Sequence, residues 1–571
     1  MFKSILVARL VSAVTCYRTI LIVASKVGAC CLLLSNALPA IAALPFSGSG
    51  SAEHRTLSHS NEEPVPLLVL ANLLEPQDSR SIEKGTGETG EIAGLIRGKE
   101  YAKALQRASA LVQREPGNPL AHNLKGSAQL ALQQWQDARS SFQAVLKLSA
   151  NDLYALQSLG RLDLLQGDSA SARRRFEAVL TKDTKNVPAL VGMAESEWLD
   201  KKEAEGFTWL DKAKAMDPQS IAISLSVARH YLSMKDPQKA IGELTQASNA
   251  DTSNAELLDL LGQAQLSAGQ KSAALETYRR LALLTPDVPE SHYRLGVVRS
   301  LVNDLPGAAN SLRTALKLRP DYVDAAYALA GIHIRLGRPE DALDVAKQLQ
   351  RNAPQSPIGP TLEGDAYAAE NRYDAAAVAY NKAFAMAPLS LIAIKVHAAE
   401  SMAGRGKIAD EKLRAWLTAH PDDTVAWQYS AGDLMRRGQY KLAIAQYQAL
   451  LQKNPNDPLT LNNLATLYGL ESDSRALEMA ERAAKAAPDS AAVADTLGWI
   501  LVQQGVLDRG RRLLEQAVSS EPSNTEIRYH LALALAKSGD NARAKRELER
   551  LLSIEPKIPQ WKDAQALLQR L

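Results

Sequence analysis

The histidines and cysteines are the residues of this chain best suited to metal or nucleophilic chemistry. The 9 histidines are His54, His59, His122, His230, His292, His333, His397, His420 and His530. No two of them have the spacing of a helical metal site such as H-E-x-x-H. All 3 cysteines (Cys16, Cys30 and Cys31) lie in the first 31 residues, so the rest of the chain has no thiol ligand.

Other catalytic signatures are also missing from the sequence. There is no phosphate-binding glycine loop and no G-x-S-x-G nucleophile elbow. A glycine-containing stretch, ADTLGWILVQQG from Ala494 to Gly505, has the periodicity of a helix rather than that of a ligand loop. We therefore expect no catalytic residues, no metal and no cofactor, and we predict that the chain is not an enzyme.

The charge balance argues against a nucleic-acid partner. The chain has 66 Lys and Arg against 63 Asp and Glu, and its first 42 residues hold four basic residues and no acidic one. The remainder is therefore close to neutral, whereas nucleic-acid binding requires a basic face.

Residues 1–42 have the order of a secretory signal peptide. A basic region precedes the apolar run from Val27 to Leu38, and Ala40-Ile41-Ala42 is a cleavage motif. We predict an exported chain, periplasmic or associated with the outer membrane of a Gram-negative bacterium. Two alternatives remain open. Val27-Gly28-Ala29-Cys30 resembles a lipoprotein signal in which Cys30 is acylated, and an uncleaved segment would anchor the chain in the inner membrane. Membrane association is expected only through this segment.

Residues 43–90 are rich in Ser, Gly and charged residues, which predicts a flexible tether. The chain then changes to a regular repeat. Prolines recur at a step of 34 residues from Pro286 through Pro320 and Pro354 to Pro388, and at steps of 33 or 34 beyond. Small residues recur with the same period at two further positions, 12 residues apart in most repeats. The predicted structural anchors are Gly126, Ala138, Gly160, Ala172, Gly262, Ala274, Pro286, Gly296, Ala308, Pro320, Ala342, Pro354, Gly364, Ala376, Pro388, Ala443, Pro455, Gly498, Pro522, Ala544 and Pro556.

This spacing predicts pairs of antiparallel helices. Each repeat holds two apolar-periodic stretches of about a dozen residues, which is the length of an ordinary helix. One small residue in each helix allows the two axes to approach closely. The proline ends the second helix because it has no N–H group and disfavours helix in the residue before it. Larger residues such as Phe142, Tyr278 and Tyr380 are expected to fill the space toward the neighbouring repeat.

A 34-residue helix-turn-helix with Gly or Ala at position 8, Ala at 20 and Pro at 32 resembles the tetratricopeptide repeat. The resemblance covers residues 91–556 as fourteen repeats, and residues 557–571 are expected to form a capping helix. It implies an all-α fold, an α-solenoid forming a right-handed superhelix. The first repeat lacks a convincing first helix, and the tenth and twelfth repeats have each lost one residue, which we place between their helices.

The resemblance also implies a binding groove lined by positions 2, 5, 9 and 12 of the first helices. The groove candidates are Tyr154, Arg161, Trp198, Arg229, Asp259, Tyr293, Tyr327, Asp365, Trp499 and Tyr529. Aromatic rings with a few charges suit a peptide, protein or glycan partner; alternatively, the rings complete packing between first helices. Asn462-Asn463 resembles part of the clamp with which some family members bind a chaperone carboxylate. Ala492 and Thr496 stand where that clamp needs basic residues, so we do not expect one.

A narrower resemblance lies near the C-terminus. The stretches Val493 to Trp499, Leu513 to Val518 and Ile527 to Asp540 resemble the last repeats of the tetratricopeptide lipoproteins of PEP-CTERM and exosortase systems. It implies an exported, non-catalytic scaffold that binds partner proteins in exopolysaccharide biosynthesis or export, or in PEP-CTERM protein sorting. The alternatives are an accessory subunit of a glycan synthase or glycosyltransferase, whose catalytic domain is on a partner, and a cytoplasmic adaptor.

Overall fold

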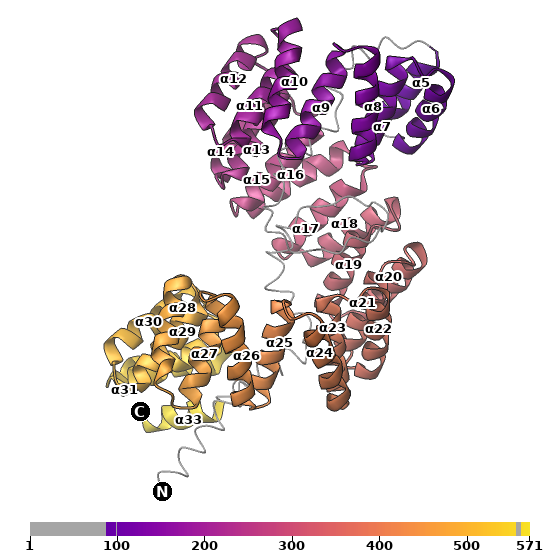
Figure 1. The fold of residues 1–571 in the computed structure, drawn as a ribbon. Coiled ribbons are helices and arrows are strands. Elements are labelled where there is room, and N and C mark those ends of the chain that lie inside the picture. Colours follow the sequence, from indigo (N-terminus) through magenta and orange to yellow (C-terminus); the bar gives the residue numbers. More distant parts are fainter. Residues whose placement is uncertain (1–86, 99, 555–560) are drawn as a thin grey trace. The chain divides into compact units, whose positions relative to one another are not determined.

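The fold of the described residues is entirely helical (Figure 1). The computed structural model describes residues 87–98, 100–554 and 561–571, which form 29 helices and no strands. The predicted signal segment, Cys30, Pro556 and the predicted tether up to residue 86 lie outside the described residues. Among the described helices, none is both long and apolar enough to cross a membrane.

The chain divides between Leu318 and Arg319 into two compact units, which we call the N-terminal body and the C-terminal body. The N-terminal body has seven helix pairs: α5 (Glu88–Arg97) with α6 (Tyr101–Arg114), α7 (Pro119–Ala131) with α8 (Trp135–Leu148), α9 (Leu153–Leu165) with α10 (Ser169–Lys182), α11 (Val187–Leu199) with α12 (Glu203–Met216), α13 (Ile221–Ser233) with α14 (Pro237–Ala250), α15 (Ala255–Ser267) with α16 (Lys271–Leu284), and α17 (Pro289–Leu301) with α18 (Leu305–Leu318).

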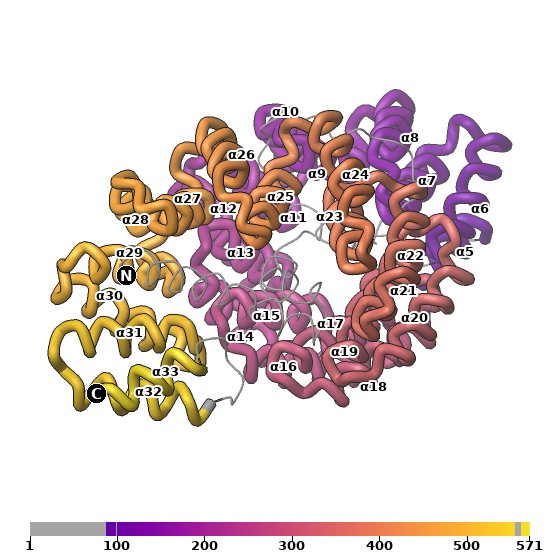
Figure 2. The backbone as a smooth tube through the Cα atoms, turned by 90° about the horizontal axis from the view of Figure 1, so that it is seen from below, coloured from indigo at the N-terminus to yellow at the C-terminus, as the bar shows by residue number. Residues whose placement is uncertain are grey.

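The C-terminal body continues the same pattern with seven pairs and one further helix. The pairs are α19 (Val323–Arg335) with α20 (Pro339–Asn352), α21 (Ile358–Ala369) with α22 (Tyr373–Met386), α23 (Ser390–Met402) with α24 (Gly406–Ala419), α25 (Thr424–Arg436) with α26 (Tyr440–Lys453), α27 (Pro458–Leu470) with α28 (Arg475–Ala486), α29 (Ala491–Gln503) with α30 (Leu507–Ser520), and α31 (Thr525–Lys537) with α32 (Asn541–Ile554). The last helix is α33 (Trp561–Arg570). Figure 2 shows the paired helices following one another along each body. The predicted fourteen repeats are therefore all present.

Local sequence signals begin and end these helices. Asp152 caps α9 by accepting a hydrogen bond from the Ala155 N–H at 2.8 Å, and Asn186 caps α11 in the same way. The second helices end two residues before the proline: α16 ends at Leu284 and Pro286 follows.

Close approach of the two helices explains the small residues at position 8. A Cβ atom added at Gly126 would lie 2.7 Å from the Phe142 ring, and one added at Gly160 would lie 2.8 Å from the Phe176 ring. Each ring comes from the second helix of the same repeat, and the Phe176 ring also lies against Gly192 of the next repeat. The second ladder is equally buried, since Ala138 and Ala376 have no exposed surface.

Repeat 10 departs from the predicted register. Three residues separate α22 from α23, whereas four separate α8 from α9, and the turn inside repeat 10 has the usual three residues. The missing residue therefore lies in the loop before α23, and the prediction that it lies between the two helices is wrong. As a result His397, and not the small Ala398, takes the place of Gly160, and it is 1% exposed.

The two ends of the described solenoid are closed by packing. The prediction that repeat 1 lacks a first helix is wrong, because α5 buries Ile92 and Ile96 against Ala104 and Leu111 of α6. At the other end α33 is present as predicted, and its Ala564 is buried in one cluster with Leu548 and Leu551 of α32.

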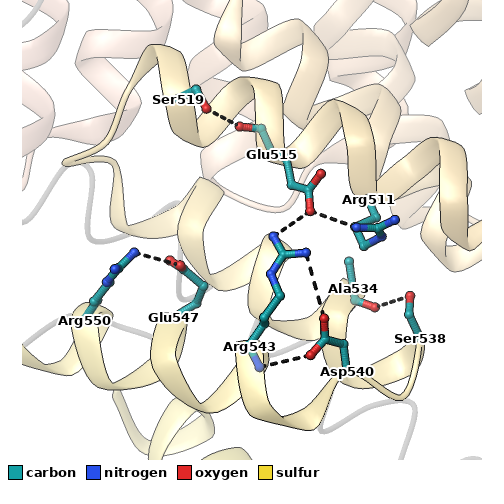
Figure 3. Close-up of polar contacts among 9 residues, drawn as sticks. All are labelled: Arg511, Glu515, Ser519, Ala534, Ser538, Asp540, Arg543, Glu547 and Arg550. Carbon is teal, nitrogen blue, oxygen red and sulfur yellow. Dashed lines mark hydrogen bonds and ion pairs between the residues drawn. The ribbon is translucent and has the colours of Figure 1, made fainter.

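Ion pairs between second helices also join successive repeats. In Figure 3, Glu515 of α30 accepts hydrogen bonds from Arg511 at 3.0 Å and from Arg543 of α32 at 2.7 Å. Asp540 accepts from the backbone N–H of Arg543 at 3.1 Å and caps α32. These partly exposed pairs link repeats 13 and 14 but add little stability.

Candidate functional site

The family resemblance assigns binding to positions 2, 5, 9 and 12 of the first helices in each body. We call this set the first-helix face. In repeat 3, for example, it consists of Tyr154, Gln157, Arg161 and Leu164 of α9.

In the N-terminal body, charged side chains of the first-helix face pair with the next repeat. Arg229 of α13 is buried and pairs with Glu256 of α15. Asp259 of α15 pairs with Arg294 of α17 at 2.5 Å, and burial raises the pKa of Asp259 despite that pairing. Arg161 lies on α9, partly exposed. The charges on this face therefore hold neighbouring first helices together.

The aromatic candidates of the N-terminal body are likewise used in packing. The Tyr154 hydroxyl lies 2.7 Å from the Ser127 hydroxyl, and burial raises its pKa. Trp198 is buried and stacks on His230, with ring centroids 3.9 Å apart. Tyr293 of α17 is also buried. These rings therefore pack between first helices and do not form an open contact surface.

The charge on the first-helix face of repeat 9 is paired in the same way, whereas position 2 of repeat 10 is Leu391, which is 44% exposed. Asp365 of α21 is buried and accepts hydrogen bonds from the Tyr380 hydroxyl at 2.6 Å and from the Lys395 ammonium group of α23. Lys395 is only 3% exposed, so each charge depends on the other. Tyr327 of α19 is partly exposed.

Repeats 11 to 13 present a different first-helix face. Position 2 carries Val425 of α25, which is 61% exposed, and Leu459 of α27, which is 52% exposed. Position 9 in the same helices is Gly432 and Thr466. Among the twelve face residues of α25, α27 and α29, Asp495 alone is charged. This region thus exposes aliphatic side chains on a face with almost no charge.

Trp499 and Asp495 of α29 lie beside His530 of α31. The imidazole Nδ1 is 2.8 Å from Asp495, and its ring is parallel to the Trp499 indole, with centroids 4.7 Å apart. Burial acts to lower the pKa of His530, but the Asp495 carboxylate outweighs it and the pKa is raised. The Lys537 ammonium lies 5.6 Å from the indole centroid. Tyr529 is partly buried against the cluster that includes Ala564 of α33.

The structure therefore separates the ten predicted groove residues. Trp198, Arg229, Tyr293 and Asp365 are buried, and the others are partly exposed. The exposed aliphatic residues Val425 and Leu459 are not among the predicted groove residues, which are all aromatic or charged. The sequence signal for them is that both are aliphatic residues at position 2 of consecutive repeats. Of the two asparagines considered for a clamp, Asn463 donates to the Tyr447 hydroxyl at 3.0 Å, and the Asn462 Oδ1 is buried with no hydrogen-bond partner.

One cluster in the C-terminal body has metal-ligand residue types: His397, Asp410 and Asp433. The Arg437 guanidinium occupies it, donating to Asp410 at 2.8 and 2.9 Å and pairing with Asp433. This hydrogen bonding lowers the pKa of Asp410 to about 2. His397 adds contacts to the Tyr429 hydroxyl at 2.8 Å and to Asp410 at 3.1 Å. Arg437 pairs with both carboxylates and Arg436 pairs with Asp433 at 2.7 Å, so the cluster joins repeats 10 and 11.

Known proteins similar to this chain are repeat proteins of varied roles. A segment of 279 residues is 23% identical to DnaJ homolog subfamily C member 3 of Gallus gallus, covering 47% of this chain and 52% of that protein. A segment of 180 residues is 25% identical to the peroxisomal targeting signal receptor of Komagataella phaffii, covering 29% and 30%. A segment of 63 residues is 41% identical to cellulose synthase operon protein C of Komagataeibacter xylinus, covering 10% and 5%. The chain thus spans about half or less of the length of these relatives.

Among solved structures, yeast Tom70 matches 80% of this chain and 96% of its own, with 15% identity and a TM-score of 0.39. Family models described as tetratricopeptide repeat match residues 95–152, 158–221, 227–299 and 302–357, then 424–467, and finally 501–568, together more than half of the chain. Such repeats typically form scaffolds that bind peptides or proteins. The chain belongs to the tetratricopeptide repeat family.

Proposed function

We propose that this chain is a non-catalytic scaffold that holds a partner protein on the first-helix face of repeats 11 to 13. The observation that supports this location is the exposure of Val425 and Leu459 on a face whose only charged side chain, Asp495, is engaged by His530. Exposed aliphatic side chains on a face with little charge are typical of a protein-binding surface.

Faces whose charges are paired are less suited to a partner. In repeats 5 to 7 and 9 to 10, the charged side chains of the first helices are paired with neighbouring repeats, as in Arg229 with Glu256 and Asp365 with Lys395. A partner would have to break those pairs before it could use the same groups, and breaking a buried pair is costly.

We further propose that the scaffold is exported and works with exopolysaccharide biosynthesis or export machinery, or with PEP-CTERM protein sorting. Residues 1–42 support export, and the C-terminal stretches that resemble PEP-CTERM-associated lipoproteins support this setting. Fractionation tests the location. Recovery of a mature chain beginning near Ala43 outside the cytoplasm supports the proposal. Full-length protein in the cytosol favours a cytoplasmic adaptor instead.

Crosslinking in cells followed by affinity purification tests the partner. We expect an interacting protein that is recovered with the unchanged chain and lost from a Leu459→Glu variant. A Gln263→Glu variant, which places the same charge at position 9 of α15 in the N-terminal body, should retain it. If polysaccharide-export or sorting components are absent from the recovered proteins, the narrower setting is wrong while the scaffold role stands.

A second candidate is an accessory subunit of a glycan synthase or glycosyltransferase whose catalytic domain is on a partner. The 41% identity to cellulose synthase operon protein C over 63 residues favours it. Recovery of a polysaccharide synthase with the chain, together with reduced polymer when the chain is deleted, would support this candidate over protein sorting.

A further inference from the structure

Three links between consecutive first helices have the same arrangement. In each of them, a basic side chain at position 6 of a first helix contacts a carboxylate of the preceding first helix. The links are Arg294 of α17 with Asp259 of α15 at 2.5 Å, Lys395 of α23 with Asp365 of α21, and His530 of α31 with Asp495 of α29 at 2.8 Å. The base at position 6 therefore helps to hold one repeat to the next.

The last of these links is the one whose base is a histidine. The unperturbed pKa is about 6.5 for histidine, about 10.4 for lysine and above about 12 for arginine. A histidine can therefore lose its charge between about pH 6 and pH 9, where lysine and arginine ordinarily keep theirs. The histidine link joins repeat 13 to repeat 14, which is the last repeat and carries α33.

The imidazole of His530 is held between an acid and an indole. Its Nδ1 lies 2.8 and 3.0 Å from the two carboxylate oxygens of Asp495, and its ring centroid lies 4.7 Å from that of Trp499, with 8° between the ring planes. The side chains of His530 and Asp495 are only 18% and 12% exposed, so little water competes for this contact. Both neighbours stabilise the imidazolium more than the neutral ring, the carboxylate by its charge and the indole by a cation–π interaction.

The charges that act on the imidazole favour its protonated form. Burial acts to lower the pKa of His530, but the charges of Asp495 and Glu526 outweigh burial and the pKa is raised. The nearby cation is Lys537 of the same helix, whose ammonium lies 5.6 Å from the centroid of the indole. The state of the link is therefore governed mainly by Asp495.

Other charged side chains of the neighbouring elements make separate contacts. Asp495 is the one charged residue of α29. Glu515 of α30 pairs with Arg543, and Glu547 of α32 pairs with Arg528. The charged residues of α33 are exposed: Lys562, Asp563 and Arg570.

We propose that the link between Asp495 and His530 makes the attachment of the last repeat depend on pH. With the imidazole protonated, α31 and the helices that follow it are held to α29 by a hydrogen bond between opposite charges. When the imidazole releases its proton to solvent, the attraction between opposite charges is lost and the last repeat opens more often. Apolar packing of Leu531 and Leu535 with Val502 remains, so the repeat loosens without detaching.

The stability that this link contributes falls as the pH rises. Because the pKa of His530 in the folded chain lies above the ordinary value of about 6.5, the contribution is fully present below about pH 6.5. It is lost as the pH rises through the folded value. The response is local to one end of the solenoid, since the equivalent bases of the other two links are Arg294 and Lys395. It does not depend on which partner the chain binds.

The test is hydrogen exchange of the full chain at several values from about pH 6 to about pH 9. The rates are expressed as protection factors, which removes the intrinsic pH dependence of amide exchange. We expect protection in α31 to fall about threefold or more over this range. Protection in α17, which carries Arg294 in the equivalent link, should stay constant.

Three substitutions assign the response to the link. His530→Gln and Asp495→Asn should each abolish the pH dependence in α31, because neither variant has an imidazole facing a carboxylate. His530→Arg copies the base of the link between α15 and α17, so protection in this variant should also be constant over the range. Thermal unfolding of each variant at about pH 9, where His530 is already neutral in the unchanged chain, verifies that the remaining repeats are folded.

A second measurement gives the pKa directly. Exchange of the imidazole C2 hydrogen, followed by mass spectrometry, reports the pKa of each histidine. We expect His530 to titrate above about 6.5 and His230, whose pKa is lowered by burial, to titrate below it. Asp495→Asn should lower the pKa of His530 and leave that of His230 unchanged.

Four results would each overturn the proposal. The first is constant protection of α31 in the unchanged chain, and the second is a loss at high pH that persists in His530→Gln. The third is an equal loss in α17, which would indicate a general effect of alkali. The fourth is a pKa of His530 at or below about 6.5.

Discussion

The first-helix faces of repeats 5 to 7 and of repeats 11 to 13 are built on the same helix pair but use their polar groups differently. In the N-terminal body, Arg229 and Asp259 pair with residues of the next repeat. In the C-terminal body, α25 and α27 carry no charge at positions 2, 5, 9 and 12, and the Asn462 oxygen has no partner. On the face of repeats 5 to 7, these polar groups join neighbouring repeats. On the face of repeats 11 to 13, the Asn462 oxygen is left without a partner among the described residues.

The difference indicates that equivalent positions of a repeat protein can either join neighbouring repeats or bind a partner. The helix packing is common to both bodies, since it depends on small residues such as Ala138 and Ala376. What differs is whether the following repeat supplies a partner for the side chain at position 5. Binding and cohesion are therefore alternatives at this position, and the following variants separate them.

The largest effect is expected where a buried charge is left alone. Asp365→Leu removes the partner of Lys395, which is 3% exposed, and should destabilise repeats 9 and 10 by about 3–5 kcal/mol. Hydrogen exchange of α21 and α23 measures this locally. The double variant Asp365→Leu/Lys395→Met should recover most of the loss. Equal exchange in the single variant and the unchanged chain would show that the pair does not hold these repeats together.

Overpacking should act alike in both bodies. Ala138→Leu and Ala376→Leu each place a larger side chain at a position with no exposed surface, at a cost of about 1–3 kcal/mol. Chemical denaturation combined with hydrogen exchange measures both. Unchanged stability in either variant would argue against the assigned repeat register, and a large difference between them would mean that the bodies do not share one packing scheme.

Position 5 should respond in opposite ways at Gln157 and at Asn462. Gln157→Met loses the hydrogen bond to Asn186 and should cost about 0.5–1.5 kcal/mol. Asn462→Leu removes an amide whose oxygen has no partner, and it should cost about 0.5 kcal/mol at most, or stabilise the chain. Local hydrogen exchange in α9 and α27 compares them. If the Asn462 variant costs as much as the Gln157 variant, Asn462 is also hydrogen-bonded to a neighbouring repeat.

A further effect is expected from acid, which acts on the charges that join repeats. Arg437 lowers the pKa of Asp410 to about 2, compared with about 3.9 for an unfolded aspartate. The stability that this pair contributes is therefore fully present above about pH 4 and is lost as the pH falls toward 2. Hydrogen exchange in α24 and α25 should show this loss, and Asp410→Asn should remove it. An unchanged acid dependence in that variant would contradict the assignment.

Much of the fold follows from the sequence, because the ladders of Gly, Ala and Pro reflect backbone constraints that any such solenoid must meet. The details that failed depend on neighbours. Ala398 continues the ladder of small residues and so predicts that repeat 10 loses its residue between the helices, but α23 begins early and His397 is buried instead. The helix α5 forms despite Gly90, because Ile92 and Ile96 pack on α6.

The binding face was less predictable than the fold. Aromatic and charged residues often mark interfaces, which is why they are predicted to line the groove. However, Trp198 stacks on His230 and Arg229 pairs with Glu256. Whether a side chain is satisfied depends on residues far along the chain. Ser490, 28 residues after Asn462, leaves that amide without the cap partner that Asp457 provides for Gln428. Position patterns alone do not contain this information.

Site-specific photocrosslinking in cells tests the central claim most directly. Benzoylphenylalanine is placed at Leu459 on the first-helix face of α27, and in a separate strain at Gln263 on the first-helix face of α15. We predict that irradiation at position 459 yields a discrete crosslinked protein species and that irradiation at position 263 does not. A discrete product from position 263 alone, or equal products from both positions, would contradict the account.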